Sequence, residues 1–361
     1  MIWLFFSYLI SIIAISNVMV FVHTMGLENE AQQNPIAAYW VSYKQLIEAT
    51  LFGIGFGSLF LLVDFLAGHW NLQRFSFGKI ILIKTTLYLL SYAILALVLY
   101  FILSSISFFP EGIFQDLPKT PYFPLSLLSF GVFLILMVIL SNFILQINRK
   151  FGPGTMLPLL LGKYHRPRVE NRVFLFIDLQ SSTQIAEALG HLRYSSLVKD
   201  CFLDLNKVVP FYEAEIYQYV GDEVVLTWPM EKALRKMNVI RFFFAFQARL
   251  KKKRPYYLRK YGLLPHFKAG ANGGEVTATE IGDIKREIAY HGDVLNTAAR
   301  IRSACNDYQK TFLVSEILAR HIVESSGFKA DFVEDIQLRG KSHFVKCYGV
   351  ERVLPPSEIP A

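Results

Sequence analysis

The hydrophobic and polar positions divide the chain into two unlike parts. Before residue 148, the apolar residues gather in four long runs, at about 2–23, 46–67, 80–104 and 125–147. Each run is long enough to cross a bilayer, because a membrane-spanning helix needs about 20 mainly apolar residues. We therefore predict a transmembrane domain of four α-helices over residues 1–147.

The basic residues beside these runs indicate their orientation. Arg74 and Lys79 lie in the link between the second and third runs, and Arg149 and Lys150 follow the fourth. Short cytoplasmic loops are enriched in Lys and Arg, so this link and both termini should face the cytoplasm. The first run lacks a basic leader and a clear cleavage site, and we interpret it as an anchor. We expect a multi-pass protein of the inner (plasma) membrane, with the lipid bilayer as a partner and residues 148–361 in the cytoplasm.

Beyond the apolar runs, the pattern changes to alternating strands and helices. Prolines and glycines interrupt residues 148–170, which we interpret as a cytoplasmic coupling linker. A second domain is predicted over 171–354 and a short tail over 355–361. Within residues 171–354, the spacing of apolar residues predicts a strand at 173–178, a helix at 182–208, a hairpin of 214–220 and 223–228, a helix at 230–253, a strand-rich segment at 266–281 and a helix at 293–304.

Composition supports this division. The chain has 361 residues, is 53% hydrophobic and carries a net charge of +8. Residues 1–147 contain five Lys/Arg and six Asp/Glu, a net charge of −1, so residues 148–361 carry a net charge of +9. The three cysteines also lie there, without metal-ligand spacing, as expected of reduced thiols. We interpret the basic run at 251–254 as a solvated helix end, and we expect no nucleic-acid partner.

Two carboxylates are candidates for metal binding. Asp178 ends the apolar strand in FLFIDLQSST, and Asp222 occupies the tip of the hairpin in YVGDEVV. Two carboxylates brought close together repel each other unless a cation lies between them. Mg²⁺ typically takes one or two carboxylates, and phosphate oxygens complete its coordination shell. The pair therefore predicts a metal site for a nucleoside triphosphate.

Three further groups could contact phosphate. Ser181, Ser182 and Thr183 open the helix after Asp178, and backbone N–H groups at a helix start bind anions. In HGDVLNTAARI, the four-residue spacing of Asn296 and Arg300 places both on one helix face, where an amide and a guanidinium suit a developing negative charge. In LRGKSHFVKCYGV, Arg339 and Lys341 flank Gly340, either as phosphate ligands or as part of a charged hairpin.

In their order and spacing, these motifs resemble the class III adenylate and guanylate cyclases over roughly residues 171–352. The segments that carry the resemblance are FLFIDLQSSTQIAEALG, YVGDEVV, GANGGEV, HGDVLNTAARI and LRGKS. The resemblance implies an α+β, ferredoxin-like catalytic domain after the α-helical membrane bundle. It also implies a homodimer with its sites at the interface.

The resemblance also implies roles for individual residues. Asp178 and Asp222, together with Leu179, would hold two Mg²⁺ or Mn²⁺ ions, while Asn296 and Arg300 would come from the partner chain. Arg339 matches the basic position that binds triphosphate. The purine is read in this family at the positions of Gln218 and Ala289. At the position of Gln218, adenylate cyclases usually have Lys and guanylate cyclases have Glu. At the position of Ala289, adenylate cyclases usually have Asp or Thr and guanylate cyclases have Cys.

The substrate and the enzyme class remain open in part. Gln218 can donate or accept a hydrogen bond, and Ala289 has no polar side chain. ATP is the expected substrate, and a guanylate or dual-specificity cyclase is the alternative. A catalytically silent regulatory homologue is the non-enzymatic alternative. The segment VGDEV is similar to the hairpin motif of diguanylate cyclases, but that class has no segment that corresponds to NTAARI.

Overall fold

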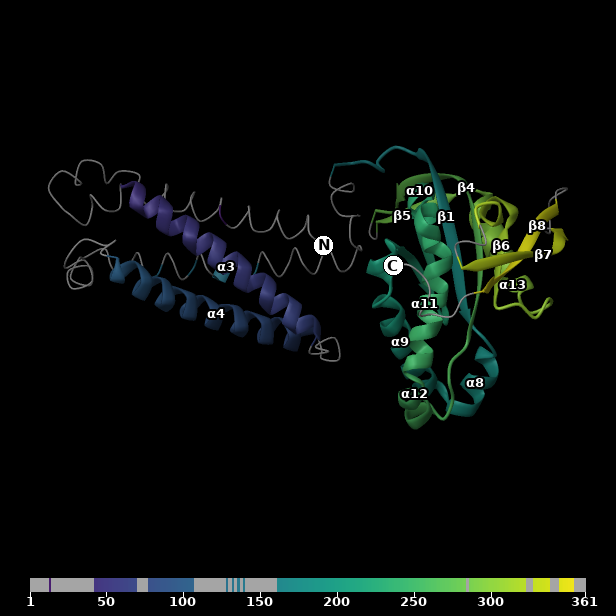
Figure 1. Ribbon diagram of the computed structural model, residues 1–361, viewed down its shortest axis with the longest axis horizontal. Helices are drawn as coiled ribbons and strands as arrows, with labels where there is room; N and C mark the ends of the chain where they lie inside the picture. The colour runs from purple at the N-terminus through teal and green to yellow at the C-terminus, as the bar shows by residue number, and fades with distance from the viewer. Residues whose placement is uncertain are drawn as a thin grey trace. The chain divides into compact units, whose positions relative to one another are not determined.

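The computed structural model describes residues 42–69, 77–106, 161–283, 286–322, 327–337 and 344–353, together with six isolated helical positions in the apolar runs. The chain separates into two compact units, Met1–Ile147 and Asn148–Ala361 (Figure 1).

Two long helices make up the described part of the first unit. Helix α3 spans Tyr43–His69 and α4 spans Phe77–Ser105, and each contains a segment apolar and long enough to cross a membrane. They pack against each other through aromatic rings, with Phe60 stacked on Tyr88 at a centroid distance of 4.1 Å. Many of their large apolar side chains are exposed, among them Leu62, Phe65, Leu90 and Ile94.

These helices correspond to the second and third predicted spans. The first and fourth spans, 2–23 and 125–147, lie outside the described residues except for isolated helical positions such as Ile13 and Val132. Two of the four predicted helices are therefore found, and the four-helix bundle itself stays a prediction. The linker before residue 161 and the tail after residue 353 also lie outside the described residues.

One mixed sheet organises the second unit. Its described strands are β1 Arg168–Leu179, β2 Glu215–Val220, β3 Glu223–Pro229, β4 Phe267–Ile281, β5 Glu287–His291, β6 Phe312–Ser315, β7 Phe328–Gln337 and β8 Phe344–Arg352. They run in the order β2-β3-β1-β4-β6-β8-β7, with β5 paired to β4. The pairing of β4 with β6 is parallel and the other pairings are antiparallel. Strand β1 thus lies inside the sheet, between β3 and β4.

The alternation along β1 creates two different faces. Leu175 and Ile177 point into the main hydrophobic core, whereas Phe174 belongs to a second cluster on the opposite face. This is the period of two that a strand buried on both faces requires. Asp178 is four residues after Phe174, and residues an even number apart in a strand share a face. Asp178 therefore lies on the second face, at the end of the strand.

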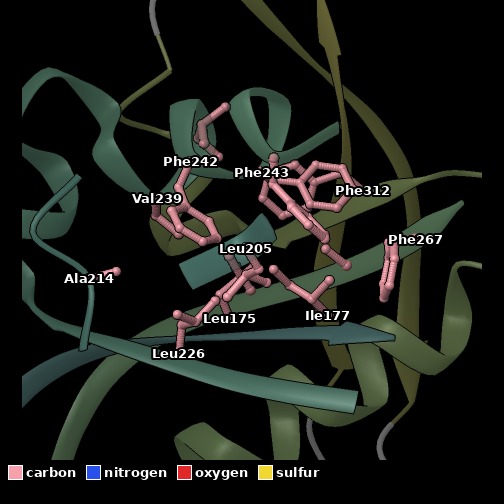
Figure 2. Packing of buried hydrophobic residues seen from close by; sticks show 14 of the residues in the cluster. Leu175, Ile177, Leu205, Ala214, Leu226, Val239, Phe242, Phe243, Phe267 and Phe312 are labelled. Carbon is pink, nitrogen blue, oxygen red and sulfur yellow. The ribbon is translucent and has the colours of Figure 1, made fainter. Parts of the chain in front are cut away.

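Helices cover both faces of the sheet. On the main core face lie α9 His191–Asn206 and α11 Asn238–Lys252, whose apolar residues recur at helical spacing. Figure 2 shows Leu205 of α9 and Phe242 and Phe243 of α11 packed over β1. On the second face lies α13 Asp293–Ala304, which buries Val294, Ala298 and Ile301 against the sheet.

Two predicted helices are shorter than the sequence pattern suggested. The helix predicted at 182–208 is α8 Ser182–Leu189 followed by α9, because Gly190 takes a positive φ of 72° and ends the first helix. The helix predicted at 230–253 is divided into α10 Met230–Leu234, the 3₁₀ turn η4 Arg235–Met237 and α11. Lys236 and Met237 have positive φ values there, and nothing in the hydrophobic pattern marks that break.

The remaining described elements are short. The 3₁₀ turn η3 Val209–Tyr212 connects α9 to β2, α12 Arg254–Tyr261 follows α11, and α14 Glu316–Ala319 follows β6. The predicted hairpin and the predicted helix at 293–304 correspond closely to β2, β3 and α13. Strand β1 begins at Arg168, a few residues before the predicted start of the catalytic domain.

Candidate active site

Asp178 lies in a row of charged residues that crosses three strands. In the register of the sheet, it is directly opposite Glu223 of β3 on one side and Lys268 of β4 on the other. Directly opposed residues have neighbouring side chains on the same face. Two carboxylates and one ammonium group are therefore brought together at the end of β1.

Asp222 stands next to this row, in the turn between β2 and β3. Gly221 has a φ of 62°, the left-handed conformation that a tight hairpin turn requires. The Oδ2 atom of Asp222 is buried and has no hydrogen-bond partner. Burial raises the pKa of the Asp178 carboxyl above its usual value, and the charge of Asp222 adds to this rise. The structure thus brings together the two carboxylates that the sequence singled out.

Two cations partly balance these carboxylates. Nη1 of Arg302 lies 3.1 Å from Oδ2 of Asp178, and its Nη2 lies 2.5 Å from Oε2 of Glu223. Nζ of Lys268 lies 3.3 Å from the same Oδ2 of Asp178. Both cations oppose the effect of burial on the pKa of Asp178. Three carboxylates and two cations therefore share this end of the sheet.

The donor set fits a divalent cation. An unpartnered buried carboxylate oxygen is costly and is normally satisfied by a hydrogen bond or an ion. Asp222 has such an oxygen, and Asp178 stands close enough for their charges to interact. Within the described residues, no group of three or more His, Cys, Asp or Glu is arranged as a metal cage, so further ligands would have to come from the nucleotide or the backbone. The Leu179 side chain is buried in the core, so only its carbonyl oxygen could serve.

The predicted phosphate-binding hydroxyls lie at the start of α8. Ser181 is the N-cap residue in a left-handed conformation, with a φ of 53° and no side-chain cap bond. The exposed Thr183 lies in the first turn of the same helix. Tyr194 of α9 stands beside Ser182 and Asp222, and burial together with the charge of Asp222 raises its pKa.

Asn296 and Arg300 lie on α13, as predicted, but not at Asp178. Arg300 has no hydrogen bond or ion pair within the part of the chain that the structure describes, and Asn296 is exposed. Arg302, two residues further along the same helix, makes the contact with Asp178 instead. Two residues correspond to a rotation of about 200° around a helix, so Arg300 points away from that carboxylate.

The two predicted purine-reading positions lie on β2 and β5, which are separated in the sheet by β3, β1 and β4. Gln218 is exposed on β2, and Ala289 is buried on β5. Their chain neighbours Tyr217 and Tyr290 are in ring contact, with centroids 5.2 Å apart. Both rings also pack against Phe174 of β1, so these tyrosines link β2 and β5 across the second face of the sheet.

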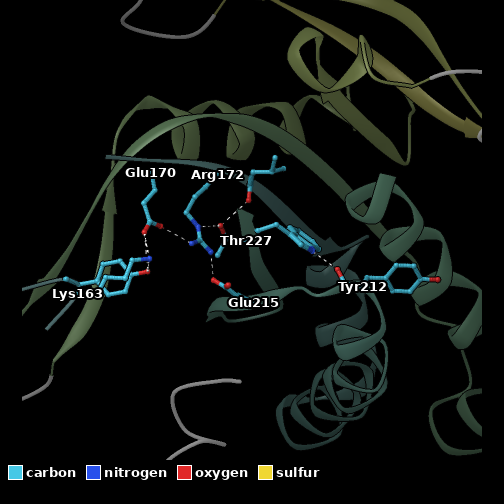
Figure 3. A network of polar contacts seen from close by, with 9 residues as sticks. Lys163, Glu170, Arg172, Tyr212, Glu215 and Thr227 are labelled. Carbon is cyan, nitrogen blue, oxygen red and sulfur yellow. Dashed lines mark hydrogen bonds and ion pairs between the residues drawn. The ribbon is translucent and has the colours of Figure 1, made fainter. Parts of the chain in front are cut away.

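A buried arginine supports these strands. Figure 3 shows Arg172 of β1 between Glu170 and Glu215, with Thr227 as a third partner. Its guanidinium also lies over the ring of Tyr290, 4.9 Å from the centroid. Arg172 thus connects β1 to the strands that carry both purine-reading positions.

Some candidate residues are not located, and others were missed. Arg339 and Lys341 lie outside the described residues. The cluster also contains four residues that the sequence pattern did not predict: Arg302, Lys268, Glu223 and Tyr194. Glu223 carried a usable signal, because it adjoins Asp222 and begins a strand opposite Asp178. Arg302 and Lys268 carried none, since their relation to Asp178 arises from tertiary packing.

Comparison with known proteins agrees with this geometry. Residues 165–352, just over half of the chain, match the family described as the adenylate and guanylate cyclase catalytic domain. The chain belongs to the adenylate and guanylate cyclase family. This confirms the resemblance found in the sequence, and the matched segment contains the whole cluster around Asp178 in this cyclase domain.

A curated relative and solved structures are also similar to this cyclase. The chain is 34% identical over 199 residues to adenylate cyclase 2 of Rhizobium meliloti (strain 1021), a match that covers 55% of each chain. The chain thus spans about half the length of that relative. A bacterial light-regulated adenylyl cyclase shares the fold, with a TM-score of 0.52 and 16% identity over 64% of this chain and 66% of that one. The adenylyl cyclase CyaB from P. aeruginosa has 20% identity and a TM-score of 0.45 over 52% of this chain and 96% of that one.

Proposed function

We propose that this protein is a membrane-bound adenylate cyclase that converts ATP to 3′,5′-cyclic AMP and diphosphate. The observation that carries the proposal is the pairing of Asp178 and Asp222, with a buried and unpartnered carboxylate oxygen, in a cyclase domain. The similarity to a curated adenylate cyclase supports ATP as the substrate.

In this reaction, the ribose 3′-oxygen attacks the α-phosphorus of ATP and loses its proton to water, while the bond to diphosphate breaks. Asp178 and Asp222 would hold two Mg²⁺ or Mn²⁺ ions, which would favour loss of that proton and neutralise charge on the phosphates when bound. The hydroxyls of Ser181, Ser182 and Thr183 and the N-terminal amides of α8 would bind phosphate oxygens. Arg339 and Lys341 would add positive charge at the triphosphate.

Asn296 and Arg300 would stabilise the charge that develops on the α-phosphate. Their position on α13 favours a homodimer. Arg302 of the same helix faces Asp178 of its own chain, so Arg300, about 200° away around the helix, is directed elsewhere. Asn296 lies six residues before Arg302, which places it about 9 Å nearer the start of the helix than Arg302, at about 1.5 Å per residue. A twofold dimer would bring this pair to the metal carboxylates of the partner.

The membrane assignment rests on α3 and α4. Both contain segments of sufficient length and hydropathy, and many of their large apolar side chains are exposed. Large exposed apolar surfaces are unusual for helices in water and are expected of helices in lipid. The protein would therefore be anchored in the inner membrane, and a signal received there would regulate the cytoplasmic cyclase domain.

GTP is the second candidate substrate. Ala289 has no side-chain polar group and Gln218 has an amide that can donate or accept, so the chain has neither the usual adenylate pair nor the usual guanylate pair. The same site and mechanism would then form cyclic GMP.

Product analysis tests the proposed function. Purified full-length protein in detergent or nanodiscs is incubated with Mn²⁺ or Mg²⁺ and with ATP or GTP, and cyclic products are identified by mass spectrometry. We expect cyclic AMP from the wild type and several orders of magnitude less from Asp222→Asn, because that variant loses a metal ligand. A folded wild type that forms neither cyclic nucleotide would favour the silent regulatory homologue.

A further inference from the structure

The charged row at the end of β1 contains an arrangement that is unfavourable by itself. Asp178 and Glu223 are directly opposite each other on antiparallel strands, and like charges in that relation destabilise a sheet. Burial raises the pKa of Glu223, and the charge of Asp178 raises it further. Something must therefore hold these two carboxylates together while they remain charged.

Arg302 does this with its two terminal nitrogens. Nη1 contacts Oδ2 of Asp178 at 3.1 Å, and Nη2 contacts Oε2 of Glu223 at 2.5 Å. A guanidinium is planar and presents donors on separate nitrogens in a fixed geometry, so each of its two Nη atoms can contact a different carboxylate, whereas an ammonium group has a single nitrogen. Arg302 thereby connects the end of β1 to the start of β3.

The contact uses only one oxygen of Asp178. Arg302 and Lys268 both bind Oδ2, and Oδ1 has no hydrogen-bond or ion-pair partner among the described residues. On the other strand, Glu223 directly follows Asp222, whose buried Oδ2 is also without a partner. One unpartnered oxygen on each metal-binding carboxylate is thus left for a cation.

The position of Arg302 is fixed by its backbone as well. A Cβ atom on Gly270 of β4 would lie 2.1 Å from the backbone nitrogen of Arg302 and 2.5 Å from its Cα. Helix α13 therefore rests directly on the strand at this point, and only glycine permits such a close approach. The guanidinium extends from a backbone that is held against the sheet.

We propose that Arg302 is a positioning residue for the metal site: it bridges Asp178 and Glu223, and so fixes Asp178 and the Asp222 turn in the geometry that binds a divalent cation. This inference rests on the proposed function, because it assumes that Asp178 and Asp222 bind metal. Groups that hydrogen-bond to metal-binding carboxylates orient them, and their loss typically weakens metal affinity about 10- to 100-fold.

A role in charge balance alone predicts the opposite result. The positive charge of Arg302 repels an incoming cation, so its removal would tighten metal binding if orientation did not matter. The sign of the change in affinity therefore distinguishes positioning from simple neutralisation.

Direct measurement of Mn²⁺ binding tests the inference. Full-length protein in nanodiscs, without nucleotide, is titrated with Mn²⁺, and free ion is quantified by electron paramagnetic resonance. We expect Arg302→Met to weaken Mn²⁺ binding about 10- to 100-fold. Glu223→Gln should also weaken it, and the double variant should lose less than the product of the two single effects, because both remove the same bridge.

Controls separate this inference from the proposed function. Arg320→Met removes an exposed arginine that pairs with Glu316, and it should leave Mn²⁺ affinity unchanged. Arg302→Lys keeps the charge but replaces two terminal nitrogens with one, so it should bind Mn²⁺ with intermediate affinity, and it replaces Arg302→Met if that variant does not fold. If Asp178→Asn has no effect on Mn²⁺ binding, the metal assignment is wrong. If Asp178→Asn abolishes binding but the Arg302 variant that folds matches or exceeds the wild type in affinity, the positioning role is wrong.

Discussion

Gly270 and Arg302 are in direct backbone contact, although they lie on different elements. The space that a Cβ would occupy at Gly270 is filled by the backbone of Arg302, whose nitrogen and Cα would lie at 2.1 and 2.5 Å, separations that real Cβ atoms essentially never show. Strand β4 also carries Lys268, and helix α13 also carries Asn296 and Arg300. The contact therefore fixes the helix with the proposed phosphate-binding pair against the strand beside Asp178.

Gly270→Ala should damage both stability and the site. The added methyl group meets backbone rather than a flexible side chain, so α13 must move away from β4. We expect a loss of about 1–3 kcal/mol of unfolding free energy, as for other overpacked positions. Cyclase activity should fall further than this loss explains, because the shift also moves Arg302 and Arg300. Thermal unfolding and initial rates on the same samples would measure the two effects.

Gly274→Ala provides the matched control on the same strand. There the new Cβ would meet only Cγ2 of Val294, at 3.0 Å, and a side-chain methyl can move. This variant should remain close to the wild type in rate and in melting temperature. Equal damage from both substitutions would show that the position along β4 does not matter.

A second cluster predicts how stability depends on pH. Oδ2 of Asp200 on α9 accepts hydrogen bonds from Tyr256 at 2.6 Å, Lys260 at 2.6 Å and Tyr261 at 2.7 Å. Burial alone would raise the pKa of Asp200, but these three bonds outweigh it and hold the pKa below its ordinary value of 3.8. A carboxyl whose pKa is lowered by folding stabilises the protein above its unfolded pKa, and this stabilisation disappears as the pH falls through the folded pKa.

Asp200→Asn should therefore destabilise the catalytic unit by about 1–2 kcal/mol at pH 7, the contribution of hydrogen bonds to a charged group. The difference from the wild type should shrink as the pH falls below the ordinary value of 3.8, and disappear once the pH has passed the lowered pKa of the folded wild-type carboxyl. Calorimetry of the full chain across this pH range would measure it. Asp307→Asn, at an exposed carboxylate, is the control, and a difference that persists unchanged at low pH would contradict the assignment.

The purine-reading positions predict weak discrimination. With an exposed amide at Gln218 and no polar side chain at Ala289, one or two hydrogen bonds would distinguish the bases. We expect ATP to be preferred over GTP by about 10- to 100-fold in kcat/KM, measured by competition. The double substitution Gln218→Glu and Ala289→Cys introduces the guanylate pair and should move the preference toward GTP. A wild type that prefers GTP would make this chain a guanylate cyclase with the same site.

Local patterns predicted the elements that carry the site, and long-range contacts explain what they missed. The Gly-Asp turn located the hairpin of β2 and β3, and apolar spacing located α13 as Asp293–Ala304. The break at Lys236 and Met237 was missed because both residues take left-handed conformations without being glycine. The role of Arg302 was also missed, since it depends on the register of three strands and on the close approach at Gly270.

Reporter fusions can test the membrane topology that the basic residues predict. A reporter after residue 35 should be external, and one after residue 72, in the link that carries Arg74 and Lys79, should be cytoplasmic. Alkaline phosphatase is active outside the inner membrane and a fluorescent protein inside it, so paired fusions report both states. A reversed result at either position would exclude the predicted four-span arrangement.

Complementation between inactive chains would test the dimeric site. Asp222→Asn removes a proposed metal ligand, and Arg300→Ala removes the guanidinium that the proposal assigns to the partner's site. Each variant alone should be nearly inactive. In a mixed dimer, one site carries both substitutions and the other carries neither. Random pairing makes half the dimers mixed, with half of their sites intact, so activity should return to about one quarter of the wild type.

Two differently tagged chains make this experiment decisive, because sequential affinity purification isolates the mixed dimers. Purified mixed dimers should reach about half of the wild-type activity per dimer, since one of two sites is intact. Two differently tagged copies of the Asp222→Asn chain, purified in the same way, should remain inactive. The side-chain directions on α13 lead to this expectation, because Arg302 contacts Asp178 of its own chain while Arg300 points away from it. Mixed dimers that are confirmed by both tags and yet remain inactive would mean that each site is formed within one chain.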